Sequence, residues 1–282
     1  MKREGGNRFV VPALALLSVI TLYPILYVIY LSTHRKLLIF HISRFIGFEN
    51  YQFLLRDDRF WNALKNTLYF TGVSVSLELL LGLCFAILLN RTFRGKGLAR
   101  AVILIPWAIP TVVSARMWEW MYNTDFGILN YVLGVKINWL GSPFWALNAA
   151  ILMDVWKTTP FVAILLIAGL QIIPGEVYRA ARVDGAGNWQ IFRKIMLPLL
   201  KPAVLIVLLF RTLDAFRVFD AIYVLTGGGP ANTTETLSVY AYKVLFQTLQ
   251  FGYGSTLSVV VFLCVGVMSI VYVNLLSRDK KA

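Results

Sequence analysis

The chain has 282 residues, of which 58% are hydrophobic, and its mean hydropathy is +0.69. This composition is too apolar for an ordinary soluble domain and indicates a protein that crosses the membrane several times. The formal net charge of +13 does not indicate a partner such as nucleic acid, because the basic residues flank apolar segments and form no long basic runs.

Six segments reach the length of about 20 largely apolar residues that a membrane-spanning helix needs. They are 9–33, 62–89, 98–122, 144–170, 202–225 and 254–276. Lys2, Arg3 and Arg8 precede the first segment as in a signal peptide, but its apolar run is too long and no small-residue cleavage site follows, so we expect a retained anchor. The sequence therefore predicts an all-α membrane protein with six transmembrane helices in a single domain, 1–282.

The distribution of Lys and Arg between the loops predicts the orientation of the spans. The N-terminus, the turn 91–100, the polar stretch 174–202 and the C-terminal tail lie on one side, which carries about twice as many basic residues as the other. Both termini are therefore expected in the cytoplasm. The loops on the other side, 34–61, 123–143 and 226–253, are too short to hold a separate domain.

Charged side chains inside the membrane are costly, and they normally face other protein groups or a water-filled cavity. Asp154 and Lys157 lie about 15 Å from the outer end of the fourth span, at 1.5 Å per helical residue. We interpret them, with the neighbouring Trp156, as a lining for a hydrophilic solute, because a sugar uses carboxylate acceptors, cationic donors and aromatic ring faces. The residues 158–160, Thr-Thr-Pro, predict an irregular helix, which is tolerated at this depth beside a cavity.

A second set of charged residues alternates in sign at a spacing of three along the fifth span. The set consists of Arg211, Asp214, Arg217 and Asp220. Residues three apart on a helix are neighbours, so the four can neutralise one another along one stripe. Two interpretations stay open for this set: either it only fixes helix packing, or Arg211, Asp214 and Arg217 contact the solute. Glu78 in the second span has no partner within its own helix.

The stretch 174–202 is the longest polar interruption in the second half of the chain. Pro174 suits the start of a helix, Gly185 and Gly187 suit a sharp turn, and Asp184 suits the cap of a following helix. Apolar residues then recur at helical spacing, at Trp189, Phe192, Ile195 and Met196. We therefore expect two short helices joined at a bend, which dock on another protein.

The sequence lacks the motifs of several enzyme classes. No G-x-x-x-x-G-K-[ST] phosphate loop occurs, because Asn90 stands where the first glycine of a loop ending at Gly95 and Lys96 would be. The two His and two Cys residues do not have the spacing of a metal site. We expect no metal, no cofactor and no catalytic centre in this chain, so any ATP hydrolysis must come from another subunit.

The polar stretch resembles the Glu-Ala-Ala loop of binding-protein-dependent ABC importers, which docks in a cleft of the ATPase subunit. The matching residues are Ala180, Ala181, Asp184, Gly185, Ala186, Phe192, Leu197 and Pro198. The resemblance implies that 171–201, hereafter the coupling loop, is cytoplasmic and transmits ATP-driven motion through 174–198. Arg179 stands where the family usually has the glutamate that names the loop, so either Glu176 replaces that glutamate or the ATPase cleft differs.

Further motifs narrow the resemblance to carbohydrate permeases related to the maltose permeases. The segments 48–51 (FENY), 66–67 (NT) and 225–230 (LTGGGP) are similar to that group. The segments 154–161 (DVWKTTPF) and 210–217 (FRTLDAFR) are similar to permeases of trehalose and related disaccharides. The first outer loop lacks the large inserted domain of the enterobacterial maltose permease, which implies smaller contacts with the binding protein.

The resemblance implies a type I ABC importer permease fold in the cell membrane, and import of a sugar such as trehalose or maltose by alternating access. Its implied partners are a second homologous permease, two ATPase subunits that hold ATP and Mg, an extracytoplasmic sugar-binding protein and membrane lipid. Alternatives are a permease for another sugar or a glycerol-phosphate-like solute, a proton-coupled secondary transporter that uses the intramembrane carboxylates, and a scaffold or assembly protein.

Overall fold

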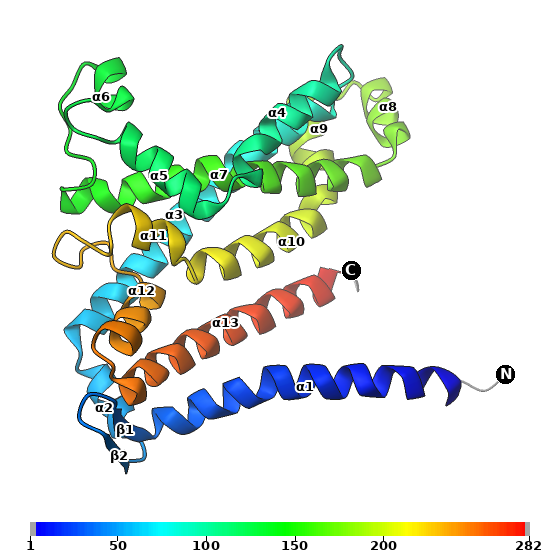
Figure 1. The fold of residues 1–282 in the computed structure, drawn as a ribbon. Helices are drawn as coiled ribbons and strands as arrows, with labels where there is room; N and C mark the ends of the chain where they lie inside the picture. The colour runs from blue at the N-terminus through cyan, green and yellow to red at the C-terminus, as the bar shows by residue number, and fades with distance from the viewer. Residues whose placement is uncertain (1–3, 280–282) are drawn as a thin grey trace. The chain divides into compact units, whose positions relative to one another are not determined.

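The computed structural model describes residues 4–279, which are mostly helical (Figure 1). The elements in chain order are α1 Glu4–Ser32, β1 His34–Leu37, β2 Ile42–Phe45, α2 Glu49–Leu55, α3 Asp58–Asn90, α4 Lys96–Ala108, α5 Thr111–Met121, α6 Ile128–Leu133, α7 Pro143–Ile172, α8 Gly175–Val183, α9 Asn188–Ile191, the π-helix η1 Phe192–Met196, α10 Leu197–Phe216, α11 Asp220–Leu225, α12 Leu237–Tyr242, the π-helix η2 Lys243–Gln247 and α13 Phe251–Asp279. Four terminal lysines and arginines used for the orientation, Lys2, Arg3, Lys280 and Lys281, lie outside the described residues. The orientation stays a prediction.

Within residues 4–279, five helical segments are long and apolar enough to cross a membrane: α1, α3, α7, the continuous segment from α9 to α10, and α13. The third expected span consists of two helices, α4 and α5, bent by 91°. Pro110 explains the break, because proline disfavours a helical conformation in the residue before it, and Ile109 is extended (φ −74°, ψ 133°). The six expected spans are confirmed when the bent pair counts as one.

The expected bounds of the fifth span, 202–225, were wrong at both ends. The helical segment begins at Asn188, passes through η1 and ends at Phe216. Residues 220–225 form the separate short helix α11. The polar stretch therefore contains one short helix, α8, and the beginning of a long one, instead of two short helices.

Contacts divide the chain into two compact units, and each combines segments that are distant in the sequence. The first unit holds the chain up to Phe60 together with Tyr240–Leu263, and the second holds Trp61–Val239 and the chain from Cys264 onward. Helices α3 and α13 contribute residues to both units. The expectation of one domain over 1–282 stays a prediction.

The loop that follows α1 in the first unit contains the antiparallel hairpin β1–β2. His34 lies opposite Phe45 in this hairpin, which is a departure from the all-helical expectation. The Asp57 carboxylate, at the start of α3, accepts hydrogen bonds from the hydroxyls of Tyr240 (2.6 Å) and Tyr253. These contacts tie the beginning of α3 to α12 and α13 without an inserted domain.

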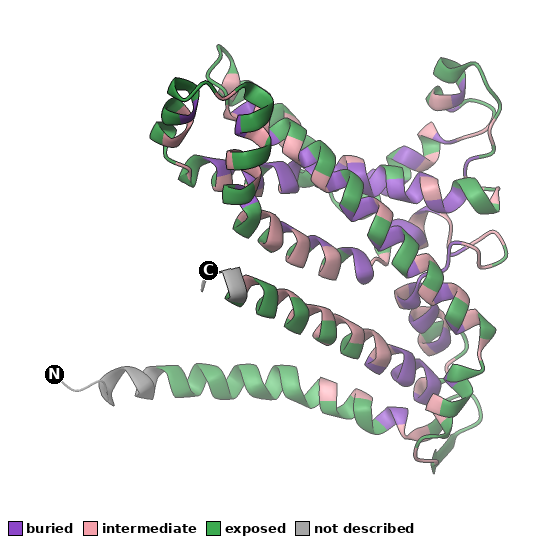
Figure 2. Ribbon diagram, turned by 180° about the vertical axis from the view of Figure 1, so that it is seen from behind, coloured by how far each residue is buried: buried purple, intermediate pink, exposed green. Residues whose placement is uncertain are grey.

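Helix α7 forms the centre of the second unit. In its most apolar 18-residue window 72% of residues are buried, against 33% in α3 and 17% in the segment from α9 to α10 (Figure 2). Glycines bring the neighbouring helices close: a Cβ atom at Gly82 of α3 would lie 2.5 Å from Val162, and one at Gly169 of α7 would lie 2.5 Å from Ala203 of α10. This close packing places the polar side chains of α3, α7 and α10 within hydrogen-bond reach.

Candidate functional site

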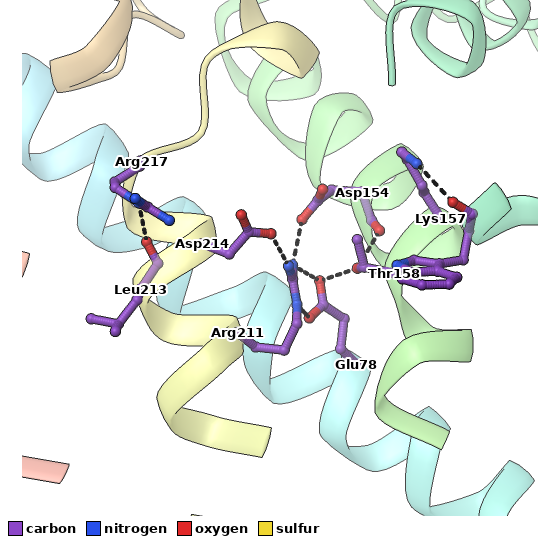
Figure 3. Close-up of polar contacts among 9 residues, drawn as sticks. Glu78, Asp154, Lys157, Thr158, Arg211, Leu213, Asp214 and Arg217 are labelled. Atoms are coloured by element: carbon purple, nitrogen blue, oxygen red, sulfur yellow. Dashed lines mark hydrogen bonds and ion pairs between the residues drawn. The ribbon is translucent and has the colours of Figure 1, made fainter. Parts of the chain in front are cut away.

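Arg211 lies at the centre of a cluster of charges from three helices, and it is buried together with Glu78 and Asp154 (Figure 3). Its guanidinium donates from Nε to Oε2 of Glu78 on α3 (2.5 Å) and from Nη2 to Oε1 of the same carboxylate (2.8 Å). Nη2 also contacts Oδ2 of Asp154 on α7 (3.1 Å), and Nη1 contacts Oδ2 of Asp214 on α10 (2.5 Å). We call Glu78, Asp154, Arg211 and Asp214 the Arg211 cluster.

The Arg211 cluster provides the partner that Glu78 lacks in its own helix. A buried ion is tolerated when it is paired and its remaining hydrogen-bonding groups are satisfied. Glu78 is fully buried, and in addition to Arg211 it accepts a hydrogen bond from the Thr158 hydroxyl on α7 (2.7 Å). The cluster therefore fixes α3, α7 and α10 against one another.

The expected self-neutralising stripe on the fifth span was wrong beyond its first pair. Arg211 and Asp214 form an ion pair as the spacing predicts. Arg217, however, lies beyond the last residue of α10, and its Nε donates to the carbonyl of Leu213 (3.0 Å). Asp220 begins the separate helix α11, so it does not continue the same helix face.

Lys157 braces the break between α4 and α5. Its Nζ donates to the carbonyl oxygens of Ile109 (2.7 Å) and Trp107 (3.4 Å). The carbonyls at the end of a helix have no partner within that helix, so a cation from a neighbouring helix satisfies them. The position of Lys157 on α7 thus helps to hold the 91° bend.

A pocket of about 300 Å³ lies beside the Arg211 cluster. Its polar lining comprises Thr111, Asp154, Lys157, Thr158, Arg211, Asp214, Arg217 and Asp220. Five of the six residues expected to contact the solute are among them, and Trp156 is not. Asp214 has a side chain that is 67% exposed, and Arg217 is also exposed, so both present charged groups to the pocket.

The aromatic residues that line this pocket are Trp107 and Phe219, and sequence reasoning missed both. Trp156 instead packs edge-to-face against Trp118 (5.7 Å between ring centroids) and against the core around α5 and α7. Trp107 lies at the end of α4, stacked on Phe161 (5.7 Å). The signal that could have found it is Pro110, which predicts the break that frees this end of the helix.

The expected irregularity in the fourth span at residues 158–160 was also wrong. Helix α7 continues from Pro143 to Ile172 with Pro160 inside it. The hydroxyl of Thr159 donates to the Val155 carbonyl (2.6 Å), as threonines commonly do one turn back along a helix. The broken backbone beside the pocket belongs to α4 and α5 instead.

The turn of the coupling loop depends on Gly185. Its φ of +81° lies in the left-handed region, which a residue with a Cβ adopts at a cost. The expectation that Asp184 caps the following helix was wrong: Asp184 is the C-cap residue of α8, and Gly187 is the N-cap residue of α9. The backbone N–H of Gly187 donates to Oε1 of Gln190 (3.0 Å).

Most side chains of the coupling loop face outward. Glu176 and Arg179 form an exposed ion pair (3.6 Å), and Val183 is 87% exposed. Trp189 is 68% exposed and stacks on Phe192 (5.4 Å between centroids). Among the predicted coupling residues Ala181 is buried, while Ala180, Asp184, Gly185 and Pro198 are exposed and Ala186 and Phe192 are half-buried. An exposed apolar and aromatic surface of this kind is typical of a site that binds another protein.

Most of the chain matches the model of one known protein family. A family model described as "Binding-protein-dependent transport system inner membrane component" matches residues 78–281. A trehalose/maltose transport system permease protein of Thermococcus litoralis is 44% identical over 273 residues, which cover 95% of this chain and 92% of the relative. A trehalose transport system permease protein of Mycobacterium tuberculosis is 43% identical (97% and 89% covered), and a lactose transport system permease protein of Rhizobium radiobacter is 36% identical (94% and 91%).

Solved structures show that the fold is that of ABC importers. A chain of a bacterial ABC transporter involved in the import of the acidic polysaccharide alginate has a TM-score of 0.84 at 22% identity, covering 98% of this chain and 96% of that one. A chain of the MetNI methionine transporter in an inward-facing conformation has a TM-score of 0.58 at 22% identity, with 81% and 96% covered. These similarities confirm the type I importer permease fold.

Proposed function

Because the chain belongs to the family of inner membrane components of binding-protein-dependent transport systems, which are permease subunits of ABC importers, we propose that its solute is a sugar. Trehalose and maltose are the proposed solutes, since two of the similar relatives are named for them. The chain is a multi-pass membrane protein whose contribution to import is the path that the solute follows.

The observation that supports this proposal is the polar pocket beside the Arg211 cluster. Carboxylates at Asp214 and Asp154 accept hydrogen bonds from sugar hydroxyls, and the guanidinium of Arg217 donates them. The ring of Trp107 offers the apolar face on which a pyranose packs. Its volume of about 300 Å³ is at the lower end of ligand pockets, which suits a site that a second permease completes.

We propose that this chain pairs with a second, homologous permease and with two ATPase subunits that hold ATP and Mg. The coupling loop supports contact with an ATPase, because its Trp189 and Val183 are 68% and 87% exposed. On the other face, an extracytoplasmic binding protein delivers the sugar to the outer loops.

The continuity of the helices suggests how the ATPases move the pocket. One unbroken helical segment runs from Asn188 in the coupling loop to Phe216, and it carries Arg211 and Asp214 near its far end. The other end of the loop follows directly on α7, which carries Asp154. Motion of the coupling loop therefore reaches both sides of the pocket through helices, which is the form of coupling that alternating access requires.

Replacement of Asp154 by alanine tests the proposal. Arg211 keeps Glu78 and Asp214 as partners in Asp154→Ala, so the importer should assemble while ATP-driven uptake of labelled trehalose or maltose into proteoliposomes falls by about tenfold or more. Thr159→Val is the matched control, because Thr159 lies on the same helix outside the pocket lining. Failure of Asp154→Ala to assemble would show that Asp154 serves packing instead.

A second condition in the same assay separates an ABC importer from a proton-coupled transporter. Uptake should continue after an ionophore collapses the proton gradient and should stop when ATP is omitted. The opposite dependence would contradict the proposed function.

A further inference from the structure

A second cavity, of about 220 Å³, lies between α3, α4 and α7, away from the polar pocket. Its lining is apolar except for one side chain, Arg100, and includes Leu89, Ile103, Leu104, Ile164 and Ile167. None of these residues lines the polar pocket. The solute path therefore does not account for this cavity.

Arg100 has hydrogen-bonding capacity that the described part of the chain leaves unused. Its Nη2 donates to the Leu89 carbonyl at 3.3 Å, while its Nε is buried without a hydrogen-bond partner among residues 4–279. A buried cationic donor without an acceptor is costly, and its cost falls when an anion binds. Arg100 therefore brings to the cavity lining a guanidinium whose Nε–H lacks an acceptor among residues 4–279.

The charge around the cavity strengthens this preference for an anion. Arg91, Arg94 and Lys96 lie on the turn that leads into α4, and no Asp or Glu occurs from residue 79 to residue 118. The second half of α7, residues 155–172, also lacks acidic residues. The positive charge at this end of α4 thus has no compensating carboxylate nearby in the sequence.

We propose that this cavity binds an anionic phospholipid, with its phosphate accepting hydrogen bonds from Arg100. Arg100 lies four residues into α4, about 6 Å along the helix from Lys96, a depth that suits a headgroup phosphate. Ile103, Leu104 and Ile164 continue the cavity toward the apolar layer and contact an acyl chain. Basic cavities between membrane helices are known to hold such headgroups, and the apolar lining favours a lipid over free phosphate.

Lipid retention by the whole purified importer tests the proposal. After detergent exchange, the importer is incubated with phosphatidylglycerol or phosphatidylcholine, and bound lipid is counted by native mass spectrometry. We expect one phosphatidylglycerol per chain, retained at least about fivefold better than phosphatidylcholine. Arg100→Gln should remove this preference, whereas the matched variant Arg94→Gln, on the exposed turn, should keep it.

A second variant keeps the test decisive if Arg100→Gln fails to assemble. Ile164→Trp fills the exposed side of the cavity while the guanidinium stays in place, and it should also lower phosphatidylglycerol retention. Unchanged retention in both assembled variants would overturn the proposal. Displacement of the lipid by millimolar inorganic phosphate would also contradict it, because the acyl-chain contacts would then contribute nothing.

Discussion

The Arg211 cluster and the coupling loop are both rich in charge, yet they use it in opposite ways. In the cluster, Arg211 is 3% exposed and contacts three carboxylates of the same chain. In the loop, Glu176 and Arg179 form one weak exposed pair while Val183 and Trp189 face outward. The charges of the Arg211 cluster are paired within this chain, whereas the coupling loop exposes charged and apolar side chains that another protein could contact.

This difference separates the residues that act within the chain from those that we propose to act on another chain. Substitution of a buried, paired charge should change folding and the shape of the pocket. Substitution in an exposed loop should leave folding intact and change only the response to a partner.

Loss of the arginine in the Arg211 cluster should have the largest effect. In Arg211→Gln the buried Glu78 carboxylate loses its charged partner, which costs about 3–5 kcal/mol and should lower the thermal unfolding temperature and the yield of assembled importer. The double variant Glu78→Gln with Arg211→Gln removes both charges and should recover much of the loss. Equal instability of single and double variants would contradict pairing as the reason for these two charges.

A change at the turn of the coupling loop should uncouple ATPase activity from sugar transport. Gly185→Val places a β-branched residue at φ +81°, at a cost of about 1–2 kcal/mol or more, and should distort the loop while the spans stay inserted. ATPase activity should then lose its dependence on sugar. Gly187→Val is the matched control, because φ is −70° there and open space surrounds the added Cβ. Normal coupling in Gly185→Val would refute the importance of this turn.

Reversal of the unusual charge in the coupling loop should have the smallest effect. Arg179→Glu removes an exposed contact of 3.6 Å and introduces the glutamate that the resemblance to the Glu-Ala-Ala loop implies at this position. The unfolding free energy should change by less than about 1 kcal/mol, and sugar-stimulated ATPase activity should stay within about twofold. A complete loss of transport would instead show that this importer's ATPase is adapted to arginine.

The sequence alone predicted those features that depend on neighbouring residues or on a short motif. Apolar length predicted the spans. Gly185 predicted the turn of the loop, which its φ of +81° confirms, whereas the coupling role assigned from the motif at 180–198 stays a prediction. The spacing of Arg211 and Asp214 predicted their ion pair, because the two residues belong to one helix turn. The contact between Glu78 and Arg211 could not be predicted in the same way, since 133 residues separate them and only tertiary packing brings them together.

The errors share a physical reason, which is the local backbone around proline and helix ends. Pro110 breaks the third span and brings Trp107 to the pocket, whereas Pro160 is accommodated inside α7. The end of α10 at Phe216 separates Arg217 and Asp220 from the stripe that periodicity assigned to them. Hydrophobic length alone does not determine where a helix stops.

The most direct measurement is a structure of the whole importer with trehalose or maltose bound. We predict sugar density in the pocket beside the Arg211 cluster, within hydrogen-bond distance of Asp214 and Arg217 and against the ring of Trp107. Density held only by the partner permease, with this pocket occupied by water, would contradict this prediction.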